Sequence, residues 1–237
     1  LPTRGIGRGE IEKALAGLLP LSGAREAWIA SVAPLANPAV EAAAAASGFR
    51  TRFIDSGADR IIELDIEAPD AAGVDRLLSA LAAGRRHFPA GAGPAGYAVV
   101  QCGSAATVDW VDGRGVFRGG YILPGPEMWL SGLALAARIA DYSGGSPDWE
   151  AAEIGRNTRD AVRRGLAVGL PAAVAAAFFQ IRRQAGAGES EAPFSLVVTG
   201  GWGRAAARLL PNPILDGELL LHGIRLFAAD REGPEHG

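Results

Sequence analysis

The 237-residue sequence is poor in the residues that bind metals or form cross-links. It contains a single cysteine, Cys102, and three histidines, His87, His222 and His236, which are scattered along the chain. One cysteine excludes an internal disulfide, and no Cys/His spacing typical of a zinc site is present. No residue near Cys102 would lower the pKa of its thiol, so we expect a small buried side chain and not a nucleophile.

The sequence also lacks a strong charge bias and a long apolar run. Its 23 basic and 26 acidic residues give a formal net charge of −3, which favours neither nucleic acid nor an anionic membrane as a partner. No segment resembles a signal peptide or an apolar span of about 18 residues, and the alanine run at 42–46 is too short. We therefore expect a cytoplasmic protein without a nucleic-acid or membrane partner.

Apolar segments that end at glycines alternate with helical patterns, which is typical of an α/β fold. Strands are predicted near 27–34, 50–54, 60–66 and 116–122, strand–turn–strand over 97–112, strand–turn–helix over 194–210, and helices near 9–19, 37–48, 73–88, 126–141, 158–182 and 217–229. Asn37 and Pro38 are predicted as N-cap and first residue of their helix. The Pro/Gly/Ala-rich segment 88–96 predicts a domain boundary, dividing the chain into residues 1–93 and 94–237.

Three glycine-containing pairs are predicted to form sharp turns after or between strands: Gly103-Ser104, Gly119-Gly120 and Gly200-Gly201. Glycine has no Cβ, so backbone N–H groups at such turns can approach phosphate oxygens. A single glycine after a strand is usually plain turn chemistry. Three of them, with hydroxyl groups at the strand ends, predict a phosphate or nucleotide cleft at the carboxyl ends of the strands.

Several segments are more specific. They are GVDR at 73–76, VVQCGSAATVDWVDGRGVFRGGYILPG at 99–125, IGRNT at 154–158, VVTGGWG at 197–203 and DGELLLHGIRLF at 216–227. In this order they resemble the catalytic GxDR segment, second phosphate loop, substrate segment, adenosine-side turn and closing helix of type III pantothenate kinases, in the acetate and sugar kinase/Hsp70/actin superfamily. The resemblance implies two RNase H-like (actin-like ATPase) domains with mixed sheets flanked by helices.

The resemblance also implies an activity. It is ATP-dependent phosphorylation of pantothenate to 4′-phosphopantothenate, the first step of coenzyme A biosynthesis, by a homodimer that uses ATP with Mg²⁺ and a monovalent cation, K⁺ or NH₄⁺. The residues it implies are Asp75 as general base, Gly73, Val74, Asp75, Arg76 and Thr158 for pantothenate, Gly103, Ser104, Gly200 and Gly201 for ATP, and Gln101 at the cation.

Taken without the resemblance, these residues have other interpretations. Asp75 can be a helix-start carboxylate that stabilises the macrodipole, with Arg76 solvated beside it, and Thr158 can be a helix N-cap or first-turn residue. Asp109, which matches an aspartate at the end of the phosphate-loop motif, can be an exposed strand carboxylate. Trp129 belongs to a helical stripe that fits a core or a dimer interface.

A second GxDR pattern, GADR at 57–60, precedes a strand-like segment. GVDR at 73–76 precedes a helix, as in the family, so we predict the second copy to be functional.

Two features depart from the family pattern. The first phosphate loop, D-x-G-N-T, does not occur before AWIASVAP at 27–34, so the first domain is expected to be N-terminally incomplete, as in a truncated reading of a longer gene. Gln101 stands where the family has an aspartate, and its neutral amide should hold a cation more weakly. Two alternatives follow: a catalytically impaired relative with a ligand-binding or regulatory role, and another small-molecule kinase of the superfamily.

Overall fold

The computed structural model describes Lys13 and residues 26–93, 95–137, 147–150, 153–187 and 194–232. The elements are β1 (Glu26–Ala30), η1 (Pro34–Ala36), α2 (Asn37–Ala46), β2 (Arg50–Ile54), η2 (Pro69–Ala71), α3 (Val74–His87), β3 (Tyr97–Cys102), β4 (Ala105–Val111), β5 (Phe117–Pro124), α4 (Pro126–Ala137), α5 (Thr158–Gln184), β6 (Ser195–Thr199), α6 (Gly203–Ala207), β7 (Ile214–Leu215) and α7 (Leu219–Glu232). Apart from Lys13, the helix predicted at 9–19 lies outside the described residues.

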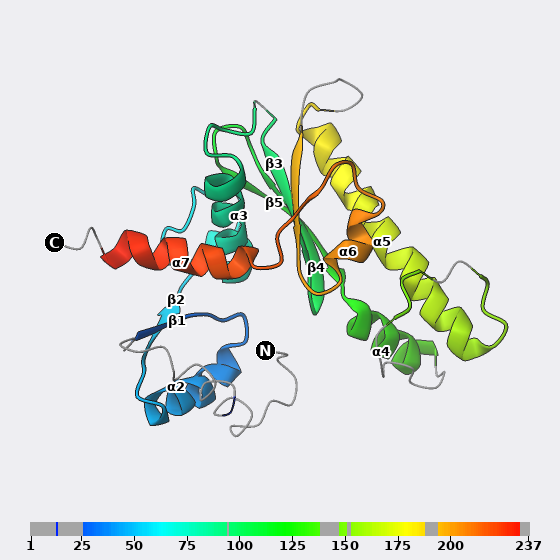
Figure 1. Cartoon of the computed structure of the whole chain (residues 1–237), viewed down its shortest axis with the longest axis horizontal. Coiled ribbons are helices and arrows are strands. Elements are labelled where there is room, and N and C mark those ends of the chain that lie inside the picture. Colours follow the sequence, from blue (N-terminus) through cyan, green and yellow to red (C-terminus); the bar gives the residue numbers. More distant parts are fainter. Residues whose placement is uncertain are drawn as a thin grey trace.

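A five-stranded mixed sheet forms the centre of the molecule, in the order β5-β4-β3-β6-β7 (Figure 1). β3, β4 and β5 form the predicted antiparallel meander, whereas β6 pairs in parallel with β3 and β7 in parallel with β6. A parallel pair needs a long connection, and the chain between β5 and β6 contains α4 and α5. The predicted α/β class, a mixed sheet flanked by helices, is confirmed.

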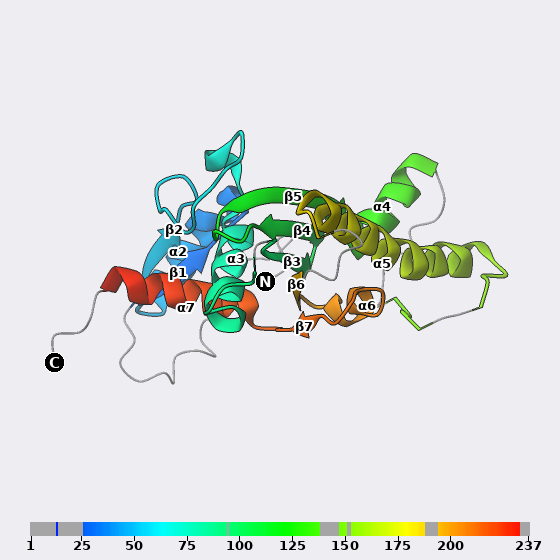
Figure 2. The ribbon, with the colours of Figure 1, turned by 90° about the horizontal axis from the view of Figure 1, so that it is seen from above.

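Helices cover both faces of this sheet (Figure 2). Along β3, Ala98, Val100 and Cys102 pack in the core beneath α5 and α6, whereas Tyr97 and Val99 pack against α3. All five side chains are buried, because a strand with helices on both sides has no solvent-facing row. The predicted burial of Cys102 is confirmed, and this burial raises the pKa of its thiol to about 12.

A smaller sheet consists of β1 and β2, paired in parallel beside α2. Trp28 of β1 packs edge-on against Phe227 of α7, with ring centroids 5.8 Å apart. α7 also packs along α3, where a Cβ on Gly223 would lie 2.2 Å from the carbonyl oxygen of Leu78. α7 therefore joins the small sheet to the helix that carries GVDR. The division into residues 1–93 and 94–237 stays a prediction.

The strand predicted at 60–66 is wrong. Leu64 forms one isolated parallel bridge with Phe117 at the edge of β5, and the pairing extends no further within the described residues. Gly119, two residues later, has φ 87° and lies at the bulge between β4 and β5. A bulge twists the strand edge away from a partner, which limits this contact to a single bridge.

Two further local predictions are wrong. Gly119-Gly120 is not a turn between strands, because both residues lie inside β5. Asn37 is the first residue of α2 and Ala36 is its N-cap; the Asn37 side chain instead accepts a hydrogen bond from Ser31 Oγ at 2.5 Å.

Among the described helices, α5 is long and apolar enough to cross a membrane by length and composition alone. The sequence-based statement that no such span exists was therefore wrong. Half of its most apolar stretch is buried inside the structure, and Leu166, Leu170, Val174 and Phe178 are completely buried against the sheet. Its apolar character is that of a core helix.

Candidate active site

The start of α3 lies over the carboxyl end of β3. The side-chain amide of Gln101 donates a hydrogen bond to Ser79 Oγ at 2.9 Å, and its carbonyl oxygen accepts a long one from Thr107 at 3.5 Å. Ser79 is completely buried. Asp75 precedes Ser79 by one helical turn and so shares its face of the helix. Asp75 therefore lies on the same side of the sheet as the polar end of β3.

The bends that follow β3 and β6 are in contact with each other. Gly200 has φ 96°, and a Cβ on it would lie 2.3 Å from the carbonyl oxygen of Cys102. The indole N–H of Trp202 donates to the carbonyl oxygen of Gly103 at 3.0 Å. Because β3 and β6 are parallel neighbours, their carboxyl ends meet at one edge of the sheet. The two predicted ATP bends thus lie together.

These bends are open to a ligand, since Gly103, Ser104, Gly200 and Gly201 are all exposed. The N–H of Gly103 donates to the carbonyl oxygen of Ala105 at 3.0 Å, so this amide is already used within the turn. Ser104, with its hydroxyl, is the next exposed residue of the same bend. Gly103 therefore serves the shape of the bend, and Ser104 and Gly201 are better placed to meet an anion.

The Asp75 carboxyl is poorly solvated. Burial raises the pKa of its carboxyl above the ordinary value, while the N–H of Arg76, 2.9 Å away, and the Arg76 charge act in the opposite direction. A carboxylate held in a poorly solvated place accepts a proton more readily than one in water. Gly73 leaves room for it, because a Cβ there would lie 2.7 Å from an Asp75 oxygen. Val74 is buried, so its side chain packs in the core.

Arg76 is not solvated, and Asp109 is not exposed. The Arg76 Nε lies 3.1 and 3.2 Å from the two carboxylate oxygens of Asp109 on β4, and Nη2 donates to the same carboxylate. The guanidinium also lies over the ring of Phe117, 5.5 Å from its centroid. Asp109 is completely buried. The exposed interpretation failed because both faces of the sheet are covered. The partners are 33 residues apart, so no local pattern could reveal the pair.

The other GxDR copy has a structural role. Asp59 accepts a hydrogen bond from the backbone N–H of Asp55 at 2.9 Å and forms an ion pair with Arg231 of α7 at 3.0 Å. The carboxylate of this copy thus closes a loop and ties it to α7. This geometry supports the choice of GVDR as the functional copy.

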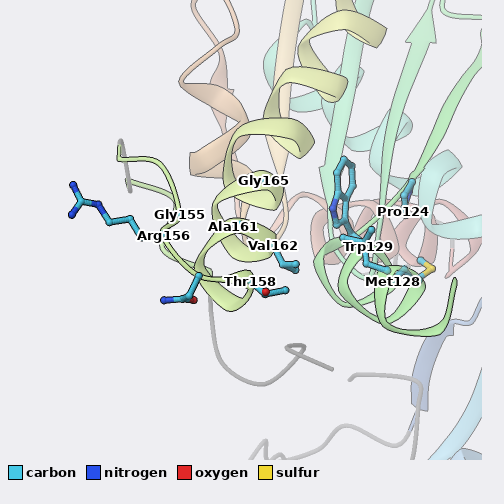
Figure 3. Close-up of a pocket in the computed structure, with 12 residues that line it drawn as sticks. Pro124, Met128, Trp129, Gly155, Arg156, Thr158, Ala161, Val162 and Gly165 are labelled. Atoms are coloured by element: carbon cyan, nitrogen blue, oxygen red, sulfur yellow. The ribbon is translucent and has the colours of Figure 1, made fainter. Parts of the chain in front are cut away.

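A second feature is a cavity of about 1030 Å³ between α4 and the start of α5 (Figure 3). Met128 and Trp129 of α4 line one side, and Thr158 and Val162 of α5 line the other. Arg156 extends away from the remaining lining side chains (Figure 3). The cavity is thus largely apolar, with the Thr158 hydroxyl among its few polar groups.

The IGRNT segment is built to present Thr158. Asn157 is the N-cap of α5, and its side-chain oxygen accepts from the backbone N–H of Asp160 at 2.9 Å. A Cβ on Gly155 would lie 2.2 Å from the backbone nitrogen of Ala161, so only glycine allows this close approach. Thr158 is therefore a first-turn residue that also lines the cavity, and its contact with pantothenate stays a prediction.

The predicted pantothenate residues fall into two groups. α3, with Gly73–Arg76, and α5, with Thr158, cover opposite faces of the main sheet. The two places are linked through the bend after β3, because Pro124 lines the cavity and the N–H of its neighbour Gly125 donates to the Ser104 carbonyl at 3.1 Å. One chain therefore does not bring Thr158 beside Asp75.

The residues around Gln101 do not fit a cation. The Gln101 amide is committed to Ser79, its carbonyl oxygen is shared with Thr107, and it supplies no charge. Across the described residues, no group of three His, Cys, Asp or Glu side chains is arranged to hold a metal ion. Gln101 therefore offers a cation only a neutral oxygen that is already hydrogen-bonded.

The family model described as type III pantothenate kinase matches residues 6–179. The chain belongs to this family. Curated relatives named type III pantothenate kinase include proteins of Rhodopirellula baltica (37% identical, 64% of this chain and 51% of the relative), Desulfovibrio desulfuricans (33%, 89% and 76%) and Thermus thermophilus (32%, 78% and 68%). The chain spans about half the length of the Rhodopirellula relative.

A solved structure supports the fold of this type III pantothenate kinase family member. A conserved Baf family protein of Campylobacter jejuni, named a candidate transcriptional activator, superposes with a TM-score of 0.52. The match covers 92% of this chain and 88% of the other, at 18% identity. At this identity the likeness concerns the fold alone.

We predict that Gly200→Ala and Gly201→Ala differ sharply in stability. The first forces an alanine into a positive φ and against the Cys102 carbonyl, which should destabilise the fold by about 2 kcal/mol or more. A Cβ on Gly201 meets no atom within 4 Å, so its change should stay within about 0.5 kcal/mol. Thermal and urea unfolding of the two variants measure this difference. Equal losses would show that the bends do not touch as described.

Proposed function

We propose that this protein transfers the γ-phosphoryl group of ATP to the primary hydroxyl of pantothenate, giving 4′-phosphopantothenate and opening coenzyme A synthesis. The observation that carries the proposal is the placement of Asp75. Its poorly solvated carboxylate is carried by the helix that covers the carboxyl end of β3, and β3 leads directly into the exposed bend at Ser104, which adjoins the bend at Gly201. ATP and pantothenate are proposed as the substrates because the chain belongs to the type III pantothenate kinase family.

The chemistry balances with the groups present. The pantothenate hydroxyl oxygen attacks the γ-phosphorus, the bond from that phosphorus to the β–γ bridging oxygen breaks, and ADP leaves with the electron pair. The hydroxyl proton passes to Asp75, which general-base catalysis requires. The Ser104 hydroxyl and the main chain at Gly201 would face the phosphates. ATP would arrive with Mg²⁺, which neutralises charge on its phosphate oxygens and usually keeps most of its waters.

The finer architecture belongs to the same proposal. ATP would lie between two RNase H-like domains, residues 1–93 and 94–237, with the second domain supplying the bends. The protein would work in the cytoplasm. The alternative, a relative that binds pantothenate or nucleotide without turnover, is favoured by one observation, the neutral Gln101 at the strand end.

We further propose that a second copy of this chain covers α4 and the start of α5. Met128 and Leu135 lie on one face of α4 with 42% and 85% of their surface exposed, and Ile154 is 84% exposed. Apolar residues gathered beside an open cavity are typical of an interface. A second copy would close the cavity around Thr158 and bring its own Asp75 toward it, which one chain does not do.

The first test is Asp75→Asn, which keeps the size of the side chain and removes the base. We expect ATP- and pantothenate-dependent ADP release to fall by about 10²–10⁴-fold. Pantothenate binding, measured by calorimetry, should persist. Asp59→Asn changes the aspartate of the other GxDR copy and should leave turnover unchanged. Binding without turnover in the unaltered chain would favour the non-catalytic alternative.

A second test concerns the interface. Leu135→Glu places a charge on the apolar face of α4 and should convert the dimer into a monomer, with a rise of at least about tenfold in the KM for pantothenate. Leu221→Glu, at a leucine 63% exposed on α7, serves as the matched control and should change neither property. Sedimentation equilibrium gives the mass. A monomeric parent chain would contradict the proposal.

A third test restores the family residue at position 101. Gln101→Asp puts a carboxylate beside Ser79 and Thr107, and its attraction for a cation is worth about 1–4 kcal/mol at a few ångströms. We expect K⁺, compared with tetramethylammonium at equal ionic strength, to raise the melting temperature and turnover of this variant. The parent chain and the neutral Gln101→Asn variant should show no response. A K⁺ response of the parent would refute the assignment of Gln101.

A further inference from the structure

Burying the Arg76–Asp109 ion pair costs desolvation free energy. Both side chains are withdrawn from water, with 14% and 0% of their surfaces exposed. Taking two charges out of water costs several kcal/mol per ion, so a buried pair is often no more stable than apolar residues of the same volume. Stability alone is therefore a weak reason for this pair.

The surroundings fix the Asp109 carboxylate in place. The hydroxyl of Thr107, two residues away on the same face of β4, acts to lower the pKa of the Asp109 carboxyl against the effect of burial. A Cβ on Gly120 of β5 would lie 2.7 Å from an Asp109 oxygen, so glycine at that position leaves the carboxylate its space. The carboxylate is thus aimed at the first turn of α3.

We propose that Asp109 is a positioning residue for phosphoryl transfer, which holds and neutralises Arg76 so that Asp75 acts as a base and not as the ion-pair partner of that arginine. The inference rests on the proposed function. It adds a residue that touches neither substrate and acts through Arg76.

Two carboxylates, those of Asp75 and Asp109, compete for the guanidinium of Arg76. Arginine stays charged at every relevant pH, so it must be matched by an anion when buried. Asp75 is its neighbour in the first turn and already accepts the Arg76 backbone N–H at 2.9 Å. Asp109 takes the guanidinium through two nitrogens, and so leaves the Asp75 carboxylate without a direct ion pair.

The charges around Asp75 predict the direction in which its pKa changes when Asp109 is removed. Of the described residues, the charged groups that interact with Asp75 are Arg76 on its own helix and Asp109 on β4. Burial raises the pKa of Asp75, and Arg76 lowers it. The charge of Asp75 raises the pKa of Asp109, and because this repulsion is mutual, the charge of Asp109 acts on Asp75 in the direction opposite to Arg76. A base works only when ionised, so its pKa sets the acidic limb of the pH–rate profile. Removing Asp109 should therefore move that limb to lower pH.

The test follows the titration of Asp75 in the folded chain by ¹³C carboxyl NMR, with Asp75→Asn for assignment. In Asp109→Asn we expect the midpoint to fall by about one pH unit, because an opposite charge at close range acts with that strength. In Arg76→Gln the midpoint should rise. The double variant should return close to the parent. Where turnover is measurable, the acidic limb of kcat/KM should follow the same three shifts.

The opposite shifts of the Asp75 midpoint in the two single variants distinguish a positioning role of Asp109 from a purely structural one. A purely structural pair would lower the melting temperature of both single variants and leave the Asp75 midpoint unchanged, and that result would overturn the inference. If Asp109→Asn fails to fold, the rise of the Asp75 titration midpoint expected in Arg76→Gln tests the inference instead. If the parent chain shows no turnover at any pH, the proposed function is wrong. The NMR titration still tests whether Asp109 controls the pKa of Asp75.

Discussion

The attachment of α3 to the strand ends is the constraint on which the candidate site depends. Gln101 bonds to Ser79 in the second turn of the helix, and Asp109 binds Arg76 in the first. Together these contacts fix both the height and the rotation of the helix start over β3 and β4. The position of Asp75, in the first turn of this helix, is fixed by the same two contacts.

The opposite end of the same helix is held by the connection between β7 and α7. His87 lies 2.9 Å from a carboxylate oxygen of Asp216, the residue that follows β7, and Arg86 lies 3.4 Å from the same oxygen. Burial acts to raise the pKa of Asp216, but the His87 hydrogen bond and nearby charges hold it below the ordinary value. α3 is thus fixed at both ends, which a helix that positions a base requires.

Much of this arrangement could be predicted from sequence, because local patterns control it. The meander, β2, α3 and α5 follow from alternation, glycine turns and helical spacing, and the bends at Gly103 and Gly200 were placed correctly at strand ends. Two of the failures depended on distant contacts. The segment at 60–66 lacks a straight partner edge, and the exposed interpretation of Asp109 assumed a solvent face that does not exist once α3 covers the sheet.

The two GxDR copies show why a motif alone does not define a site. Both supply a carboxylate beside an arginine after a glycine, yet Asp59 is used up by a backbone N–H and by Arg231, whereas Asp75 stands at a helix start with its arginine drawn away by Asp109. The two copies differ in what they pack against: GADR belongs to a loop tied to α7, whereas GVDR packs against the covered strand β4. A covered strand can bury a second carboxylate, and in GVDR that second carboxylate binds the arginine and leaves Asp75 without it, as the proposed role of Asp75 as a base requires.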